Sequence, residues 1–240
     1  MVGLILLAFG LRIFRLDFQS LWIDEGWTVY FSGLPLPQLF NLLRTEEIHP
    51  PGYFPMINLW TRLAGHSEFA LRYLSLLFSV LAVPLTYRLG LALSSRRLGL
   101  IAALLMGLAP YQVWHAQEAR MYAALSAAAV ASMWGFVTGC QRGGWRGWSI
   151  YLAGTLSAIA IHYHGLVLVG IQGLFLLLTW RTHRHGYRRW AGIVALILLC
   201  YTPWLLFSGT FVRDYVGWLP QLALWQTYWR SAKAYSIGEL

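Results

Sequence analysis

The chain has 240 residues, of which 58% are hydrophobic and 11% charged, with a formal net charge of +9 and a mean hydropathy of +0.54. This composition excludes a water-soluble globular protein and indicates an all-α polytopic integral membrane protein. The basic residues, all arginine except Lys233, lie mostly in short loops beside apolar runs. That placement excludes the clustered basic face of a nucleic-acid-binding protein.

Apolar runs predict about seven transmembrane helices. The candidate spans are residues 2–15, 68–89, 98–114, 119–139, 148–163, 165–180 and 190–208. Several of them are shorter than the roughly 20 residues of a full crossing. We expect Pro110 to kink the third span near the outer surface. The glycines of GFVTG at 135–139 favour close packing between helices.

Three of the predicted loops are rich in arginine. By the positive-inside rule these loops face the cytoplasm, and the chain starts on that side too. Their arginines are Arg88, Arg96, Arg97, Arg142, Arg146, Arg181, Arg184, Arg188 and Arg189.

All nine carboxylates then fall on the outer side of the membrane. They are Asp17, Asp24, Glu25, Glu46, Glu47, Glu68, Glu118, Asp214 and Glu239. Because stray charges are costly in apolar surroundings, this one-sidedness predicts chemistry or polar-ligand binding at the outer face.

The first outer loop, about residues 16–67, is expected to hold short interfacial helices joined by proline-rich turns. Residues 52–65 could be counted as a further span, but as a helix they reach only about 21 Å against a hydrocarbon core of roughly 30 Å. We therefore interpret them as a helix lying at the outer interface. Asn58 and Arg62 stand opposite its apolar stripe, which consists of Tyr53, Met56, Ile57, Trp60, Leu63 and Ala64.

Asp24 is the first candidate catalytic residue. In SLWIDEGWTVYFSGL, helical spacing places it on one stripe with Trp27, Phe31 and Leu34, and places Glu25, Thr28 and Ser32 on the next stripe. A carboxylate on the apolar face of an interfacial helix would be desolvated and would bind a proton more strongly, which suits a general base. The alternative is that Asp24 and Glu25 only favour a helix N-terminus.

Four further residues could bind a ligand at the outer face. His49 precedes Pro50-Pro51-Gly52, a stiff turn that can aim its ring. Glu118 and Tyr122 share a helix face, and the planar fork of Arg120 beside acidic groups suits a phosphate.

His162 and His164 flank Tyr163, with Gly165 as a helix C-cap after them. If this segment is helical, the two rings point roughly 200° apart and do not share a metal.

These motifs resemble the GT-C superfamily of membrane glycosyltransferases, in particular the family 39-like group related to protein O-mannosyltransferases and lipid A aminoarabinose transferases. The resemblance rests on LWIDEGWTVY, HPPGYF, SEFALRYLSLLFSVLAVPLTYRLG and HAQEARMYAA, in that order, and covers most of residues 10–180.

The resemblance implies a hexosyl- or pentosyltransferase that moves a sugar from a polyprenyl-phosphate donor to a lipid, glycan or protein acceptor, with inversion. The catalytic carboxylate of the first loop maps to Asp24, with Glu25 beside it. Arg120, Glu118, His49, Tyr122 and His162 are then the candidates for binding the donor phosphate or sugar.

The resemblance also bears on location, extent and cofactors. It implies an inner or plasma membrane protein whose site faces outward, with a catalytic domain over residues 1–208 and an outer segment, 209–240, that begins a longer C-terminal part. The resemblance leaves open whether a divalent metal is a cofactor, and Asp24, His49 and Glu118 are the candidate ligands for one.

Three other functions compete with a transferase. A transporter would place charges near the middle of the bilayer, and a non-catalytic lipid-binding subunit would tolerate loss of Asp24. An acyltransferase that uses His162 or His164 would leave the first-loop carboxylates without a role.

Overall fold

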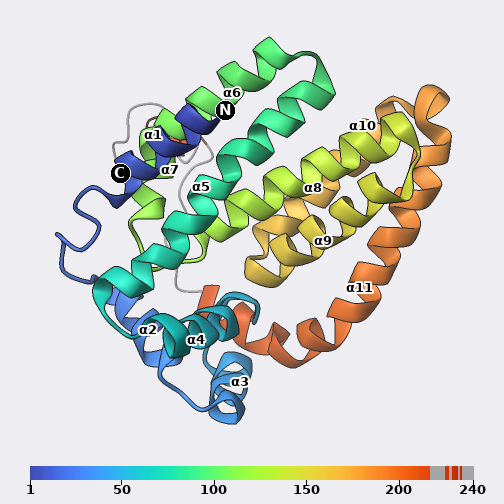
Figure 1. Ribbon diagram of the computed structural model, residues 1–240. Helices are drawn as coiled ribbons and strands as arrows, with labels where there is room; N and C mark the ends of the chain where they lie inside the picture. Colours follow the sequence, from blue (N-terminus) through green and yellow to red (C-terminus); the bar gives the residue numbers. More distant parts are fainter. Residues whose placement is uncertain (217–224, 227–228, 232, 234–240) are drawn as a thin grey trace.

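The computed structural model describes residues 1–216, 225–226, 229–231 and 233 (Figure 1). Over these residues the chain is all-helical, as predicted, and contains no strand. Much of the predicted outer segment 209–240, with Glu239, lies outside the described residues.

The described residues form eleven helices, and Pro110 separates the sixth from the seventh. The first five are α1 Val2–Ile13, α2 Ile23–Ser32, α3 Leu36–Thr45, α4 Tyr53–Ala64 and α5 Glu68–Leu93. The others are α6 Arg96–Leu108, α7 Pro110–Ala116, α8 Tyr122–Arg142, α9 Trp145–Ile161, α10 His164–Leu178 and α11 Trp180–Val216.

All seven predicted spans coincide with helices, but the count of seven crossings is not confirmed. Among the described residues, three segments are long and apolar enough to cross a membrane: Glu68–Leu93, Tyr122–Arg142 and Gly186–Leu206. The pair α6 and α7, bent by 56°, raises the number to four if it is one span. The helices α1, α9 and α10 have only 12, 17 and 15 residues, which is short for a 30 Å core.

Glycines let α8 and α9 pack closely, as the GFVTG pattern predicts. A Cβ at Gly135 would lie 2.2 Å from Tyr151 N, and one at Gly154 would lie 2.5 Å from Ser132 N. Side chains larger than hydrogen would therefore push these two helices apart.

Pro110 breaks the span that contains it, and Arg12 fills the break. The carbonyls of Met106 and Gly107, at the end of α6, accept hydrogen bonds of 3.2 and 2.9 Å from the Arg12 guanidinium. Arg12 is fully buried in α1 and also donates to Ser79 of α5. One cation thus ties α1, α5 and α6 together while satisfying carbonyls that the proline leaves free.

Residues 16–67 contain the short helices α2, α3 and α4, and the buried face of α4 is displaced from the predicted stripe: it keeps Tyr53 and Ile57 and adds Phe54, Asn58 and Thr61. Asn58 is 1% exposed, whereas Leu63 is 80% exposed. The reason is that the Asn58 amide donates to the carbonyls of Phe31, Ser32 and Leu34 at the end of α2, at 3.3, 2.8 and 2.8 Å. Phe31 O also accepts from Leu34 N at 3.4 Å, and the Asn58 amide supplies a donor to the carbonyls that follow at this helix end.

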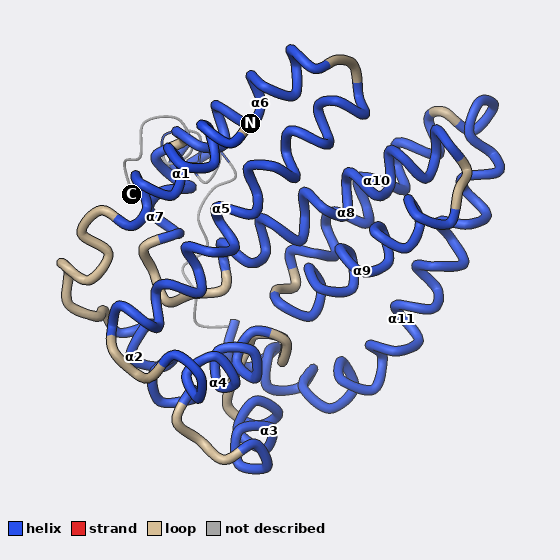
Figure 2. Tube along the Cα trace, in the orientation of Figure 1, coloured by secondary structure: helices blue, strands red, loops and turns tan. Residues whose placement is uncertain are grey.

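The arginine-rich connections gather at the end of the bundle opposite α2–α4 (Figures 1 and 2). Gln141 donates to the carbonyl of Ala92, and Arg189 donates to that of Gly143. These bonds join the α5–α6 connection to the α8–α9 connection, and the latter to α11. The connections predicted to carry the arginines therefore lie together at one end of the described fold.

Asn58→Ala should lower the free energy of unfolding by about 2 kcal/mol, because buried carbonyls at the end of α2 lose their donor. Thermal unfolding in detergent measures this as a lower midpoint. Asn41→Ala, an exposed position in α3, is the matched control. Equal midpoints for the two variants would contradict the capping role of Asn58.

Candidate active site

A buried ion pair between Glu25 and Arg72 lies at the base of the site. Arg72 Nε lies 2.9 Å from Glu25 Oε1, and Arg72 Nη2 lies 2.8 Å from Oε2. The two side chains are 1% and 3% exposed. This bidentate geometry is the strongest form of the arginine–carboxylate contact, and it joins α2 to α5.

Two backbone groups complete the surroundings of Glu25. Ala119 N donates to Oε1 at 2.7 Å, and Trp22 N donates to Oε2 at 3.4 Å, which forms a capping box at the start of α2. Arg72 uses its remaining N–H groups on the carbonyls of residues 16, 19 and 20. The pair therefore joins α2, α5 and the segment before α8.

The predicted orientation of α2 holds only in part, because Phe31 of the Asp24 stripe is buried but the neighbouring polar stripe is buried as well. The stripe of Glu25, Thr28 and Ser32 faces the interior, because Glu25 needs Arg72, while Trp27 is 50% exposed. Asp24 is 38% exposed and so is not a desolvated carboxylate.

Asp24 lies beside Arg120. Arg120 Nη2 is 3.7 Å from Asp24 Oδ2, and Nη1 donates to the Asp24 carbonyl at 3.2 Å. The guanidinium is 5% exposed, and its buried Nε has no hydrogen-bond partner among the described residues. The predicted acidic and phosphate-binding segments thus meet, although 96 positions separate them.

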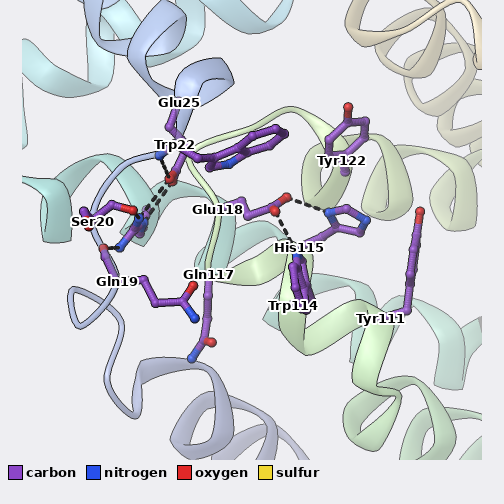
Figure 3. Close-up of a pocket in the computed structure, with 11 residues that line it drawn as sticks. Gln19, Ser20, Trp22, Glu25, Tyr111, Trp114, His115, Gln117, Glu118 and Tyr122 are labelled. Atoms are coloured by element: carbon purple, nitrogen blue, oxygen red, sulfur yellow. Dashed lines mark hydrogen bonds and ion pairs between the residues drawn. The ribbon is translucent and has the colours of Figure 1, made fainter. Parts of the chain in front are cut away.

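An open cavity of about 580 Å³ is lined in part by the Glu25–Arg72 pair (Figure 3). Glu118 projects into it and accepts from Trp114 Nε1 at 2.6 Å and from His115 Nδ1 at 2.8 Å. The lining residues are Gln19, Ser20, Trp22, Glu25, Arg72, Tyr111, Trp114, His115, Gln117, Glu118 and Tyr122. Of the predicted site residues, Glu25, Glu118 and Tyr122 line it, whereas Asp24, Arg120, His49 and His162 do not.

The histidines meet on the other side of Tyr122. The His49 ring lies 5.2 Å from that of His162, since Gly52 docks on α9 by donating to the carbonyl of Ala160 at 2.7 Å. Glu47 Oε1 lies 2.6 Å from His49 Nδ1. The Tyr122 ring lies 6.3 Å from that of His162, so it separates the cavity from the histidines.

His162 and His164 are adjacent, not far apart as a helical segment would have them. His162 has extended backbone angles at the end of α9, and its Nδ1 lies 2.8 Å from that of His164. Burial, followed by the nearby His164, His49 and Arg120, lowers the pKa of His162 to about 4. Within the described residues, no three histidine, cysteine, aspartate or glutamate side chains form a group that could hold a metal.

Sequence reasoning missed several residues of the site, above all Arg72. Arg72 lies inside an apolar span, where a buried cation needs an anionic partner. Its presence there was the signal that could have indicated a buried ion pair. Trp22, Trp114 and His115 also went unremarked, although each lies within four residues of a predicted site residue.

A comparison with protein families adds to this geometry. The family described as dolichyl-phosphate-mannose-protein mannosyltransferase matches residues 48–207, more than half of the chain. Asp24 and Glu25 precede the matched residues, while His49, Glu118, Arg120 and His162 lie within them. No curated protein matches the chain. The family and the apolar helices together make this an integral membrane protein.

Glu25→Gln should lower the free energy of unfolding by about 3 kcal/mol, because it leaves the Arg72 charge buried without a counter-charge. The double variant Glu25→Gln/Arg72→Leu removes that charge as well and should recover much of the loss. Thermal or denaturant unfolding of the single and double variants measures the coupling. Purely additive effects would contradict a direct pair.

The low pKa of His162 predicts a loss of stability in acid. Between about pH 6.5, the ordinary histidine value, and about pH 4, the unfolded chain binds a proton at His162 that the folded chain does not. Stability should therefore fall as the pH falls through this window. His162→Gln should flatten that part of the pH profile of the unfolding midpoint, whereas His66→Gln, at an exposed position, should not.

Proposed function

This chain belongs to the dolichyl-phosphate-mannose-protein mannosyltransferase family, and we propose that it transfers a sugar from a polyprenyl-phosphate-linked donor to an acceptor hydroxyl at the outer membrane face. In this proposal the anomeric carbon is inverted and Asp24 is the general base. Glycosyltransferase activity in general follows from the family, whereas the donor, the residues and the mechanism are proposals.

The observation that carries the proposal is the different surroundings of two adjacent carboxylates. Both oxygens of Glu25 are occupied by Arg72 and by backbone N–H groups. Asp24 is partly exposed beside Arg120 and can accept a proton from a bound molecule. Of the two, Asp24 therefore suits a proton-transfer role and Glu25 suits a positioning role.

The proposed step balances without a general acid. The acceptor oxygen attacks the anomeric carbon from the face opposite the phosphate, and the hydroxyl proton passes to Asp24. The bond between the anomeric carbon and the phosphate oxygen breaks, and the lipid phosphate leaves with the bonding electrons. A phosphate needs no protonation in order to leave, but its developing negative charge needs a cation nearby.

Arg120 is the proposed cation. Its charge is held at the Asp24 carboxylate, and its buried position reduces screening by water. Glu118, with Trp22 and Trp114 around the same cavity, is the proposed sugar-binding group, because a carboxylate accepts from hydroxyls and aromatic rings pack against the apolar face of a sugar. His49, Tyr122 and His162 lie at the border of this region as further donor-binding candidates.

Asp24→Asn should reduce transfer by about 10²- to 10⁴-fold while leaving the fold intact, because the amide cannot accept the proton. The assay follows label from polyprenyl-phosphate sugars into candidate acceptors, with the purified protein in liposomes. Asp17→Asn, an exposed carboxylate in the same loop, should transfer as the wild type does. Unchanged transfer by Asp24→Asn would remove it as the base and favour a non-catalytic role for this segment.

A further inference from the structure

The end of the bundle far from the candidate active site has two adjoining hollows of its own. Between the end of α8, the start of α9 and the first half of α11, they measure about 440 and 490 Å³. Arg188, Arg189 and Gly143 line both hollows, and Arg142 lines the first. Figure 1 shows the α8–α9 and α10–α11 connections side by side at this end.

No acidic residue lies close in the sequence to the arginines that line these hollows. The sequence contains no aspartate or glutamate between Glu118 and Asp214. Arg189 bonds a neutral carbonyl, that of Gly143. Among the described residues, neither Arg142 nor Arg188 makes a hydrogen bond or an ion pair. An anion supplied from outside the chain is therefore favoured at this place.

The second hollow continues from the arginines to an apolar wall. Ile193 and Leu196 of α11 line it, and Leu196 is 49% exposed. Trp145, 74% exposed, stands at the edge, as amphipathic rings do at headgroup level. A cationic rim joined to an apolar wall matches a molecule with an anionic headgroup and an acyl chain, and a water-soluble phosphate would leave that wall uncovered.

We propose that these hollows form a binding site for one anionic glycerophospholipid, whose phosphate lies among Arg142, Arg188 and Arg189 and whose acyl chain runs along Ile193 and Leu196. The site is separate from the proposed transfer reaction and does not depend on it. It would tie the α8–α9 connection to α11 through the lipid, in addition to the hydrogen bond from Arg189 to Gly143.

Native mass spectrometry of the detergent-purified protein, titrated with phosphatidylglycerol, tests the proposal. Arg142→Gln/Arg188→Gln should weaken binding by about 30-fold, since each arginine near an anionic headgroup contributes about fivefold. This pair spares the Arg189–Gly143 bond. The matched control is Arg96→Gln/Arg97→Gln, two exposed arginines at the start of α6 outside both hollows, which should bind as the wild type does.

A second variant tests the shape of the site without changing its charge. A Cβ at Gly192 meets no atom within 4 Å, so Gly192→Leu can fill the hollow without disturbing the helix. It should also weaken phosphatidylglycerol binding. Unchanged binding by Gly192→Leu, or equal losses in the two arginine pairs, would overturn the site in favour of general surface attraction.

Binding of two other ligands distinguishes a lipid site from a site for soluble phosphate. Phosphatidylcholine with the same acyl chains should bind much more weakly than phosphatidylglycerol, and inorganic phosphate should not displace the bound lipid. Equal binding of the two lipids would overturn the need for an anionic headgroup. Displacement by inorganic phosphate alone would show a site for a soluble anion and would contradict the lipid assignment.

Discussion

The ion pair between Glu25 and Arg72 is the contact on which the candidate site depends. Two charges taken out of water are stable together only when their geometry is good and their remaining hydrogen-bonding groups are satisfied. Here Arg72 binds both carboxylate oxygens and three carbonyls, and Ala119 N supplies a further bond. Loss of either partner would leave the other charge buried, so the pair fixes α2 against α5 strongly.

The Glu25–Arg72 pair also determines where Asp24 lies, because Asp24 and Arg120 are the sequence neighbours of Glu25 and Ala119. Glu25 contacts the backbone of Ala119, and the residues next to them, Asp24 and Arg120, form the neighbouring contact. Because successive residues of a helix point about 100° apart, burial of Glu25 turns Asp24 toward the rim. An acidic dipeptide is thus divided into one carboxylate that holds the fold and one that remains accessible.

The sequence was sufficient for the helices, because apolar runs, proline breaks and close glycine pairs act locally. Pro110, the glycines of α8 and the gathering of arginines at one end all behave as predicted. The buried faces of α2 and α4 could be predicted only in part from apolar periodicity, since polar groups decide the rest. Asn58 turns inward to reach the end of α2, and Glu25 turns inward to reach Arg72. Those partners are distant in sequence, and a hydrophobic stripe carries no information about them.

The central claim is that Glu25 positions while Asp24 reacts, and single-turnover transfer by two folded variants tests it most directly. The comparison is between Asp24→Asn and the doubly neutralised Glu25→Gln/Arg72→Leu, each in liposomes with labelled polyprenyl-phosphate sugar. We expect the double variant to lose part of its transfer rate per folded molecule, because the segment that holds Asp24 loses its anchor, and Asp24→Asn to lose far more, at least about a hundredfold. A folded double variant that is inactive beside an active Asp24→Asn would contradict the claim.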